Sequence, residues 1–222
     1  MQLRTRLILL GVLASACAQA APALSPARQA RLDHAVLDYE AGRRAPARRV
    51  FETLSMQRVP AADYNRAVMH LRSEVPRADA AKGRRLLERA ARGGFVTAQM
   101  TLARALENGE LGPRELVRAH HWYALAAQAG SVEAQLAMGT AHYLGRGLSK
   151  DPARAVHWFR EAAKGGDVGA MYLLASMYEQ GDGIERDLRL ARYWYAAAAG
   201  NGDAAAPDKV KELDALLAGV PG

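Results

Sequence analysis

Three kinds of residue are scarce in this chain of 222 residues, which has one cysteine, two isoleucines and only 6% aromatic residues. A single cysteine allows no disulfide within the chain. The strands of large β-sandwiches and barrels need β-branched and aromatic residues, so the composition argues against those folds. The 20 glycines fall far short of the one in three that collagen requires. Half of the residues are hydrophobic, which argues against a disordered chain.

Alanine takes the place of the missing residues, with 47 in the chain. It has the highest helix propensity, and its small side chain lets two helices approach closely. We therefore expect an all-α protein. The formal net charge is +7, from 30 basic and 23 acidic residues, and 25 of the basic residues are arginine.

The first 20 residues have the features of an export signal. Arg4 and Arg6 precede a short apolar run over residues 7–13, and Ala18 and Ala20 fit the small-x-small cleavage rule. The apolar run is too short for a transmembrane helix, which needs about 20 residues. Removing this segment takes away two arginines and no acidic residue, so 28 basic and 23 acidic residues leave a net charge of +5.

Cys17 allows two interpretations of this segment. If cleavage follows Ala20, Cys17 is discarded and the exported protein is periplasmic. Alternatively, residues 13–17 resemble the lipobox of a bacterial lipoprotein signal, in which Cys17 becomes lipidated and anchors the protein to a membrane. The lipobox usually has leucine where Ala14 stands here. Both alternatives place the protein in the cell envelope.

A repeat of 36 residues is the main signal in the sequence. Each tryptophan recurs at this spacing and is followed by another aromatic residue, and alanine and glycine columns keep the same register. The clearest columns are Trp122, Trp158 and Trp194; Tyr123, Phe159 and Tyr195; Gly109, Gly145 and Gly181; and Gly94, Gly130, Gly166 and Gly202.

Each copy is expected to form a helical hairpin of a helix A and a helix B. In the last copy the apolar spacing predicts helix A over residues 168–180 and helix B over 188–199. The glycines at 181 and 183 suit a turn with positive φ, Ile184 is expected to fold back onto the core, and Asp187 to cap helix B. Trp158 is expected to pack between hairpins, so Trp158→Ala should cost about 3–5 kcal/mol.

The copies resemble Sel1-like repeats, a branch of the tetratricopeptide superfamily. The resemblance implies a right-handed α-solenoid of stacked helical hairpins with a capping helix at its C-terminus. The residues that carry it in one copy are Ala134, Met138, Gly145, Gly147, Asp151, Ala155, Trp158, Phe159 and Gly166. The resulting division is a signal peptide at 1–20, a linker at 21–33, a tetratricopeptide-like hairpin at 34–58, a degenerate copy at 59–94, full copies at 95–130, 131–166 and 167–202, and a C-terminal capping helix and tail at 203–222.

No residue pattern predicts a catalytic, cofactor or metal site. His121 and His157 share a repeat column, and packed helices would hold them about 8–10 Å apart, which is too far for one zinc ion. The loop at 181–187 lacks the repeated acids of a calcium loop. Phosphate-binding loops and hydrolase motifs are absent from the sequence. We therefore expect no enzyme and no cofactor.

The tetratricopeptide resemblance implies that the A helices line a groove that holds a partner. Tyr143 and Leu144 are the strongest candidates for a peptide anchor, and the alternative is that they fill a local gap. The predicted groove residues are Met100, Arg104, Glu107, Asn108, Leu136, Thr140, Tyr143, Leu144, Tyr172, Ser176, Glu179 and Gln180.

Paired arginines occur in the N-terminal half, and we interpret them as solvated faces with acidic neighbours. An anionic partner in the envelope is the alternative, and nucleic acid is not expected because aromatic residues do not alternate with them. The arginines are Arg43, Arg44, Arg48, Arg49, Arg84 and Arg85.

The sequence thus predicts a non-catalytic scaffold that binds a protein or peptide partner in the bacterial cell envelope. One alternative is a lipoprotein that helps to assemble an envelope polymer or a secretion complex. Another is a hydrolase of cell wall or of β-lactams. Membrane attachment is expected only if Cys17 is lipidated.

Overall fold

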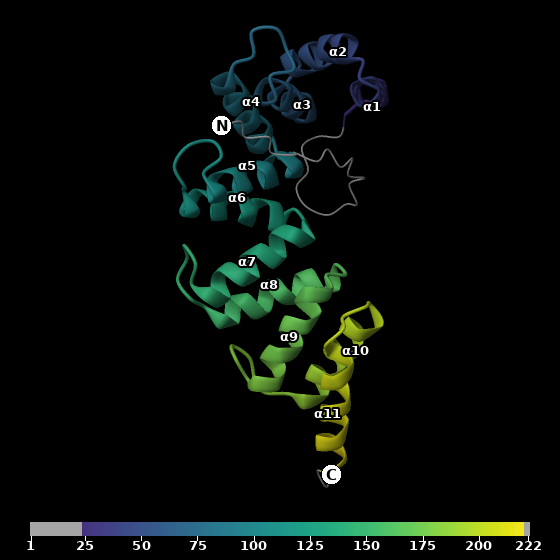
Figure 1. The fold of residues 1–222 in the computed structure, drawn as a ribbon, viewed down its shortest axis with the longest axis vertical. Coiled ribbons are helices and arrows are strands. Elements are labelled where there is room, and N and C mark those ends of the chain that lie inside the picture. The colour runs from purple at the N-terminus through teal and green to yellow at the C-terminus, as the bar shows by residue number, and fades with distance from the viewer. Residues whose placement is uncertain (1–23, 220–222) are drawn as a thin grey trace. The chain divides into compact units, whose positions relative to one another are not determined.

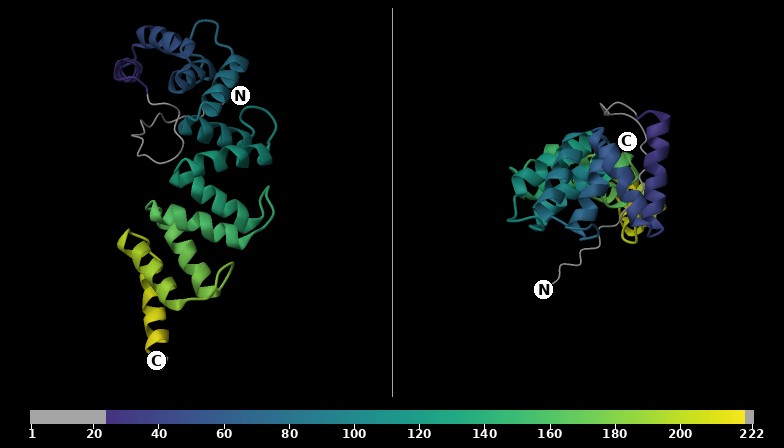
Figure 2. Two further views of the ribbon diagram at one scale, coloured as in Figure 1. Left: turned by 180° about the vertical axis from the view of Figure 1, so that it is seen from behind. Right: turned by 90° about the horizontal axis from the view of Figure 1, so that it is seen from above.

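The computed structural model describes residues 24–219, and within that range the chain forms eleven α-helices and no strand (Figure 1). The predicted signal segment and Cys17 lie outside the described residues. The chain divides into two compact units, residues 1–102 and 103–222, and the division falls within α5 (Val96–Asn108). The helices of residues 26–92 in the first unit each pack against the next one in the sequence, and so do the helices of residues 116–218 in the second unit, which can be followed by colour in Figure 2. The prediction of an all-α stack of hairpins is confirmed.

The first unit contains two hairpins and the start of α5. They are formed by α1 (Pro26–Glu40), α2 (Arg44–Met56), α3 (Pro60–Leu71) and α4 (Ala80–Arg92). Phe51 and Leu54 of α2 are fully buried against α1 and α3. Helix α1 already begins at Pro26, so most of the range expected to be a linker is helical. The reason is that proline suits the first turn of a helix and that the side chain of Leu32 is buried in the core.

The second unit continues with the regular copies. Its remaining helices are α6 (Leu116–Gln128), α7 (Val132–Leu144), α8 (Pro152–Lys164), α9 (Val168–Gln180), α10 (Leu188–Gly200) and α11 (Ala206–Ala218). The predicted helix A over 168–180 is α9, and the predicted helix B ends one residue later than expected, at Gly200.

The loop between α9 and α10 forms as its residues indicate. Gly181 and Gly183 have φ values of 75° and 73°. A Cβ on Gly183 would lie only 2.4 Å from the carbonyl carbon of Pro152, so glycine is also needed for the close approach to the preceding hairpin. Ile184 packs against the core, and the carboxylate of Asp187 accepts hydrogen bonds from the backbone N–H groups of Arg189 and Leu190.

In the last two copies the aromatic pair differs from expectation in which ring is buried, whereas in the first full copy both Trp122 and Tyr123 are buried. Phe159 and Tyr195 are each 1% exposed, whereas Trp158 and Trp194, immediately before them, are only partly buried. Because successive residues on a helix point about 100° apart, only one of the two rings can face helix A of the same hairpin. Trp158 instead lies edge-on against the ring of His157 near the surface.

Helix α11 covers the last hairpin, as a capping helix should. Leu213 is fully buried against α10, while Leu216 remains half exposed. The guanidinium of Arg192 on α10 forms an ion pair with the carboxylate of Asp214 on α11. Among the described helices, none combines the length and the apolar character needed to cross a bilayer.

Candidate interaction surface

The predicted groove residues lie on α5, α7 and α9, the A helices of three successive copies. On α7, Leu136 and Thr140 are partly buried and Leu144 is 60% exposed. On α9, Tyr172 and Ser176 are partly buried at the equivalent positions, and Gln180 is exposed. These six residues define what we call the A-helix face of the second unit. Both helices thus present accessible side chains with the spacing of one helical face.

Of the predicted groove residues on α5, only Arg104 and Asn108 are exposed. Met100 belongs to the first unit and is 8% exposed, so it offers little surface to a partner. The guanidinium of Arg104 forms an ion pair with the carboxylate of Glu133 at the start of α7. That pair is exposed and joins two successive A helices of the second unit.

Glu107 and Glu179 share a structural role that sequence reasoning missed. The Tyr123 hydroxyl donates to Glu107 Oε2 at 2.8 Å, and the Tyr195 hydroxyl donates to Glu179 Oε2 at 2.8 Å. Each bond joins helix B of a copy to its own helix A. Burial, followed by the hydrogen bond to the carboxylate, raises the pKa of both tyrosines well above the usual value. The two glutamates are therefore engaged within the fold.

A cation from further along the chain accompanies each glutamate. Arg146 Nη2 lies 3.7 Å from Glu107 Oε1, and Lys209 Nζ lies 3.1 Å from Glu179 Oε1. Lys209 belongs to α11, so this ion pair also fastens the capping helix to α9. The side chains of Glu107 and Glu179 are also only 25% and 19% exposed, so both carboxylates serve mainly within the fold.

Tyr143 occupies the repeat column of Glu107 and Glu179. It makes an aromatic contact where those copies have a tyrosine–glutamate hydrogen bond. Its ring lies 6.4 Å from the ring of Phe159, which has no hydroxyl to donate. Tyr143 is partly buried against the core of the second unit. Its contacts thus fit the gap-filling alternative for this residue, and of the predicted pair only Leu144 is left as a freely exposed apolar side chain.

Leu144 is the last residue of α7, and the equivalent ends of α5 and α9 are the polar residues Asn108 and Gln180. A leucine that is 60% exposed at this position leaves most of its side chain in contact with solvent. An apolar side chain surrounded by polar ones is the usual form of an anchor point in a protein interface. The A-helix face is thus suited to bind a peptide or protein surface.

Several buried polar residues were also missed from the sequence. Gln99 and Gln135 share a column, and each donates from Nε2 to a backbone carbonyl of the preceding helix B, that of Ala91 or Ala127. The signal for this role was their identical spacing. Among the described residues, no group of three or more His, Cys, Asp or Glu side chains is placed to hold a metal ion.

Comparison with known proteins agrees with the repeat pattern. A family model described as the Sel1 repeat matches residues 60–95, 96–131, 132–167 and 168–203. A search of curated proteins gives no match. Sel1 repeats generally mediate protein–protein interactions, and Sel1 repeat proteins are typically non-catalytic scaffolds.

Solved structures show the same fold. A protective antigen present in uropathogenic Escherichia coli strains, which displays an SLR fold, is 25% identical with a TM-score of 0.74 and is matched over 88% of this chain and 43% of its own. The chain thus spans less than half of that protein. A Sel1 repeat protein from Oxalobacter formigenes is 27% identical with a TM-score of 0.74, over 86% of this chain and 78% of its own. Because the matched copies cover more than half of the sequence, the chain belongs to the Sel1 repeat family.

Proposed function

We propose that this protein is a scaffold of the bacterial cell envelope that binds a partner protein or peptide on the A-helix face of its second unit. The observation that carries the proposal is the exposure of Leu144 at a column that is polar in the neighbouring copies. The buried columns keep alanine and a few larger apolar residues, whereas Leu136 and Leu144 differ from their counterparts on α9, Tyr172 and Gln180. A uniform interior with a varied accessible face is what a binding scaffold needs.

The location in the envelope rests on the export signal of residues 1–20. Two mature forms follow from it, a periplasmic protein and a lipoprotein anchored through Cys17. The second form favours the role of an assembly factor for an envelope polymer or a secretion complex. Membrane fractionation and mass spectrometry of the mature N-terminus distinguish the two forms, because only a lipidated Cys17 retains the protein in the membrane.

The binding face is tested by cross-linking in intact cells with the variant Leu144→Gln. The substitution introduces glutamine, the residue that the next copy has at the equivalent position, Gln180 of α9. It removes the apolar anchor without changing a core residue. Val117→Ala is a matched control, since Val117 is 72% exposed on α6 and its repeat equivalent is Ala153. Loss of a specific partner in Leu144→Gln alone supports the proposal. An unchanged set of partners in both variants contradicts it.

A further inference from the structure

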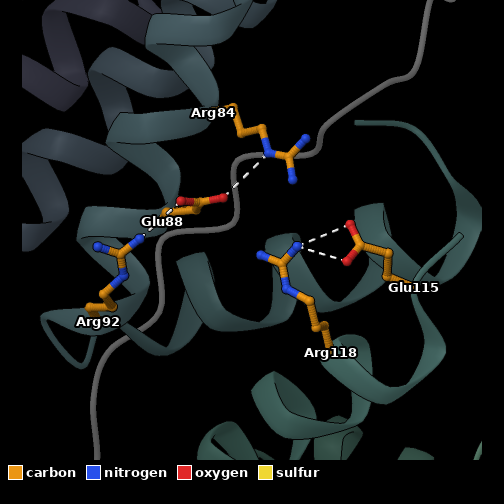
Figure 3. A network of polar contacts seen from close by, with 5 residues as sticks. All are labelled: Arg84, Glu88, Arg92, Glu115 and Arg118. Atoms are coloured by element: carbon orange, nitrogen blue, oxygen red, sulfur yellow. Dashed lines mark hydrogen bonds and ion pairs between the residues drawn. The ribbon is translucent and has the colours of Figure 1, made fainter. Parts of the chain in front are cut away.

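The basic surplus of the protein lies entirely in its first unit. Residues 24–102 carry 15 basic and 8 acidic side chains, a net charge of +7, whereas residues 103–222 carry 13 and 15, a net charge of −2. Many of the basic side chains have acidic neighbours, as on α4, where Arg84 and Arg92 both contact the carboxylate of Glu88 (Figure 3). Such pairs agree with the interpretation of solvated, neutralised faces. A different group of cations surrounds a pocket of the same unit.

This pocket has a volume of about 250 Å³ and opens between α2, α3, the α3–α4 loop and α4. Its cationic lining residues are Arg48, Arg66, Arg77 and Lys82, one from each of these elements. The single acid in the lining is Glu52, which lies 3.7 Å from Arg48 and so neutralises that residue. The volume is below the range of about 300–1,000 Å³ for drug-sized ligands. The pocket therefore suits a small anion or a single charged headgroup.

Three of the cations are available to a ligand. The side chains of Arg77 and Lys82 are exposed and have no polar partner among residues 24–219. Arg66 is held in place because its Nη1 donates to the hydroxyl of Ser55 at 2.8 Å. Ser55 is itself buried and donates to Asp63. This buried support orients the Arg66 guanidinium at the pocket in advance of any ligand.

His70 adds an uncharged donor to the same pocket. It is only 8% exposed, and its Nδ1 accepts a hydrogen bond from the backbone N–H of Asp79 at 3.2 Å. A neutral ring with Nδ1 as acceptor carries its proton on Nε2. Burial, and then the charges of Lys82 and Arg66, lower the pKa of His70, so the ring is neutral near pH 7. Within the described part of the chain Nε2 has no hydrogen-bond partner, and it is not one of the unpartnered polar atoms that are fully shielded from solvent, so this donor is open to a ligand in the pocket.

We propose that this pocket binds an oxyanion of the phosphate class, as free phosphate or as the phosphate of a lipid headgroup. Arg66, Arg77 and Lys82 supply the positive charge and His70 Nε2–H the neutral donor. The donors come from three different chain segments, and a tetrahedral ion can present a separate oxygen to each of them. A planar carboxylate offers only two oxygens. Arginine and lysine are also the side chains that commonly hold phosphate. This site is independent of the A-helix face.

The test follows the ring resonances of His70 by NMR in the full chain while inorganic phosphate is added at pH 7.5 and constant ionic strength. We expect a saturable shift that acetate and chloride do not reproduce. The double variant Arg77→Gln/Lys82→Gln should weaken phosphate binding at least about tenfold, because two charge-assisted contacts are lost. Both side chains are exposed, so the variant is expected to fold. Lys211→Gln, a change at a side chain 78% exposed on α11, should leave the affinity unchanged.

Vesicles distinguish the source of the phosphate. If vesicles containing phosphatidic acid shift the same His70 resonances and phosphatidylcholine vesicles do not, the ligand is a headgroup. If only inorganic phosphate does so, the ligand is a soluble phosphate. A shift that is equal for phosphate and acetate, or that persists unchanged in the double variant, overturns the proposal.

Discussion

The Tyr195 hydroxyl on α10 donates a hydrogen bond of 2.8 Å to Glu179 Oε2 on α9. The same bond joins Tyr123 to Glu107 two copies earlier, so it is a feature of the repeat and not of one hairpin. A buried hydroxyl needs an acceptor, and the glutamate supplies one without entering the apolar core itself.

The copy between them changes three residues together. Phe159 stands in the tyrosine column, Tyr143 in the glutamate column, and Gly139 in a column that is otherwise Ala103 and Ala175. A Cβ on Gly139 would lie 2.5 Å from Cδ1 of Phe159. The phenylalanine ring thus packs directly onto the backbone of α7, in space that an alanine methyl would fill. This copy thus lacks the hydroxyl, the carboxylate and the methyl group together. The three changes form an alternative way of packing helix B against helix A.

Removing the Tyr195 hydroxyl tests the first arrangement. Tyr195→Phe should lower the free energy of unfolding by about 1–2 kcal/mol, because a hydrogen bond to a charged group is lost and Glu179 keeps only its contact with Lys209. Tyr193→Phe is the control, since Tyr193 is 60% exposed, and its effect should stay within about 0.5 kcal/mol. Urea unfolding followed by circular dichroism measures both. Equal stabilities of the two variants would show that the bond contributes nothing.

Exchanging the three residues tests the second arrangement. Gly139→Ala alone should destabilise the protein by about 1–3 kcal/mol, because the new methyl collides with the ring of Phe159. Alanine is the better helix former, by about 1 kcal/mol, so propensity alone predicts the opposite sign. The triple variant Gly139→Ala/Tyr143→Glu/Phe159→Tyr should recover most of the loss, since it installs the set found in the other copies. Additive effects of the three substitutions would contradict this coupling.

Much of the fold could be predicted because the repeat aligns its own copies. Helix bounds, loop glycines and the cap at Asp187 all follow from local residue chemistry at fixed spacing. The role of Tyr143 could not be read from its own column, since an aromatic residue among glutamates resembles an exposed anchor. Only its pairing with Phe159 in a distant column shows that it fills the place of a hydrogen bond. Sequence spacing also marks Trp158 and Phe159 equally, and it is their direction around the helix that decides which ring is buried.

The burial of these two rings gives a third prediction. Phe159→Ala should cost about 3–5 kcal/mol, the usual value for removing a fully buried phenyl ring. Trp158→Ala should cost less, about 1–2 kcal/mol, because its indole already contacts solvent in the folded state. This revises the larger loss expected for Trp158 from the sequence. Thermal unfolding of both variants ranks them, and a larger loss for Trp158→Ala would show that the indole carries the packing.

Two buried histidines of the second unit make stability depend on pH. His120 and His142 are 5% and 6% exposed, and Nδ1 of each lacks a hydrogen-bond partner in the described structure. Burial is the main cause that lowers the pKa of both. The charges of His142 and Arg146 lower the pKa of His120 further, and the carboxylate of Glu107 raises it. The charge of Arg154 lowers the pKa of His142 further, whereas Asp151 and a backbone hydrogen bond at Ser149 raise it.

In the unfolded chain each histidine has the ordinary pKa of about 6.5. Because the pKa is lower in the folded protein, the unfolded chain binds more protons once the pH falls below about 6.5. The stabilisation is therefore complete above about pH 6.5 and is lost as the pH falls below it, by at most about 1.4 kcal/mol per histidine for each pH unit. His142→Leu, which installs the residue of the equivalent position Leu106, should flatten the decline between pH 6.5 and 5.5. His121→Gln, a change at an exposed histidine, should leave the decline as in the original protein. Denaturant unfolding at several pH values measures the slopes, and parallel curves for all three proteins would show that His142 is not protonated on unfolding in this range.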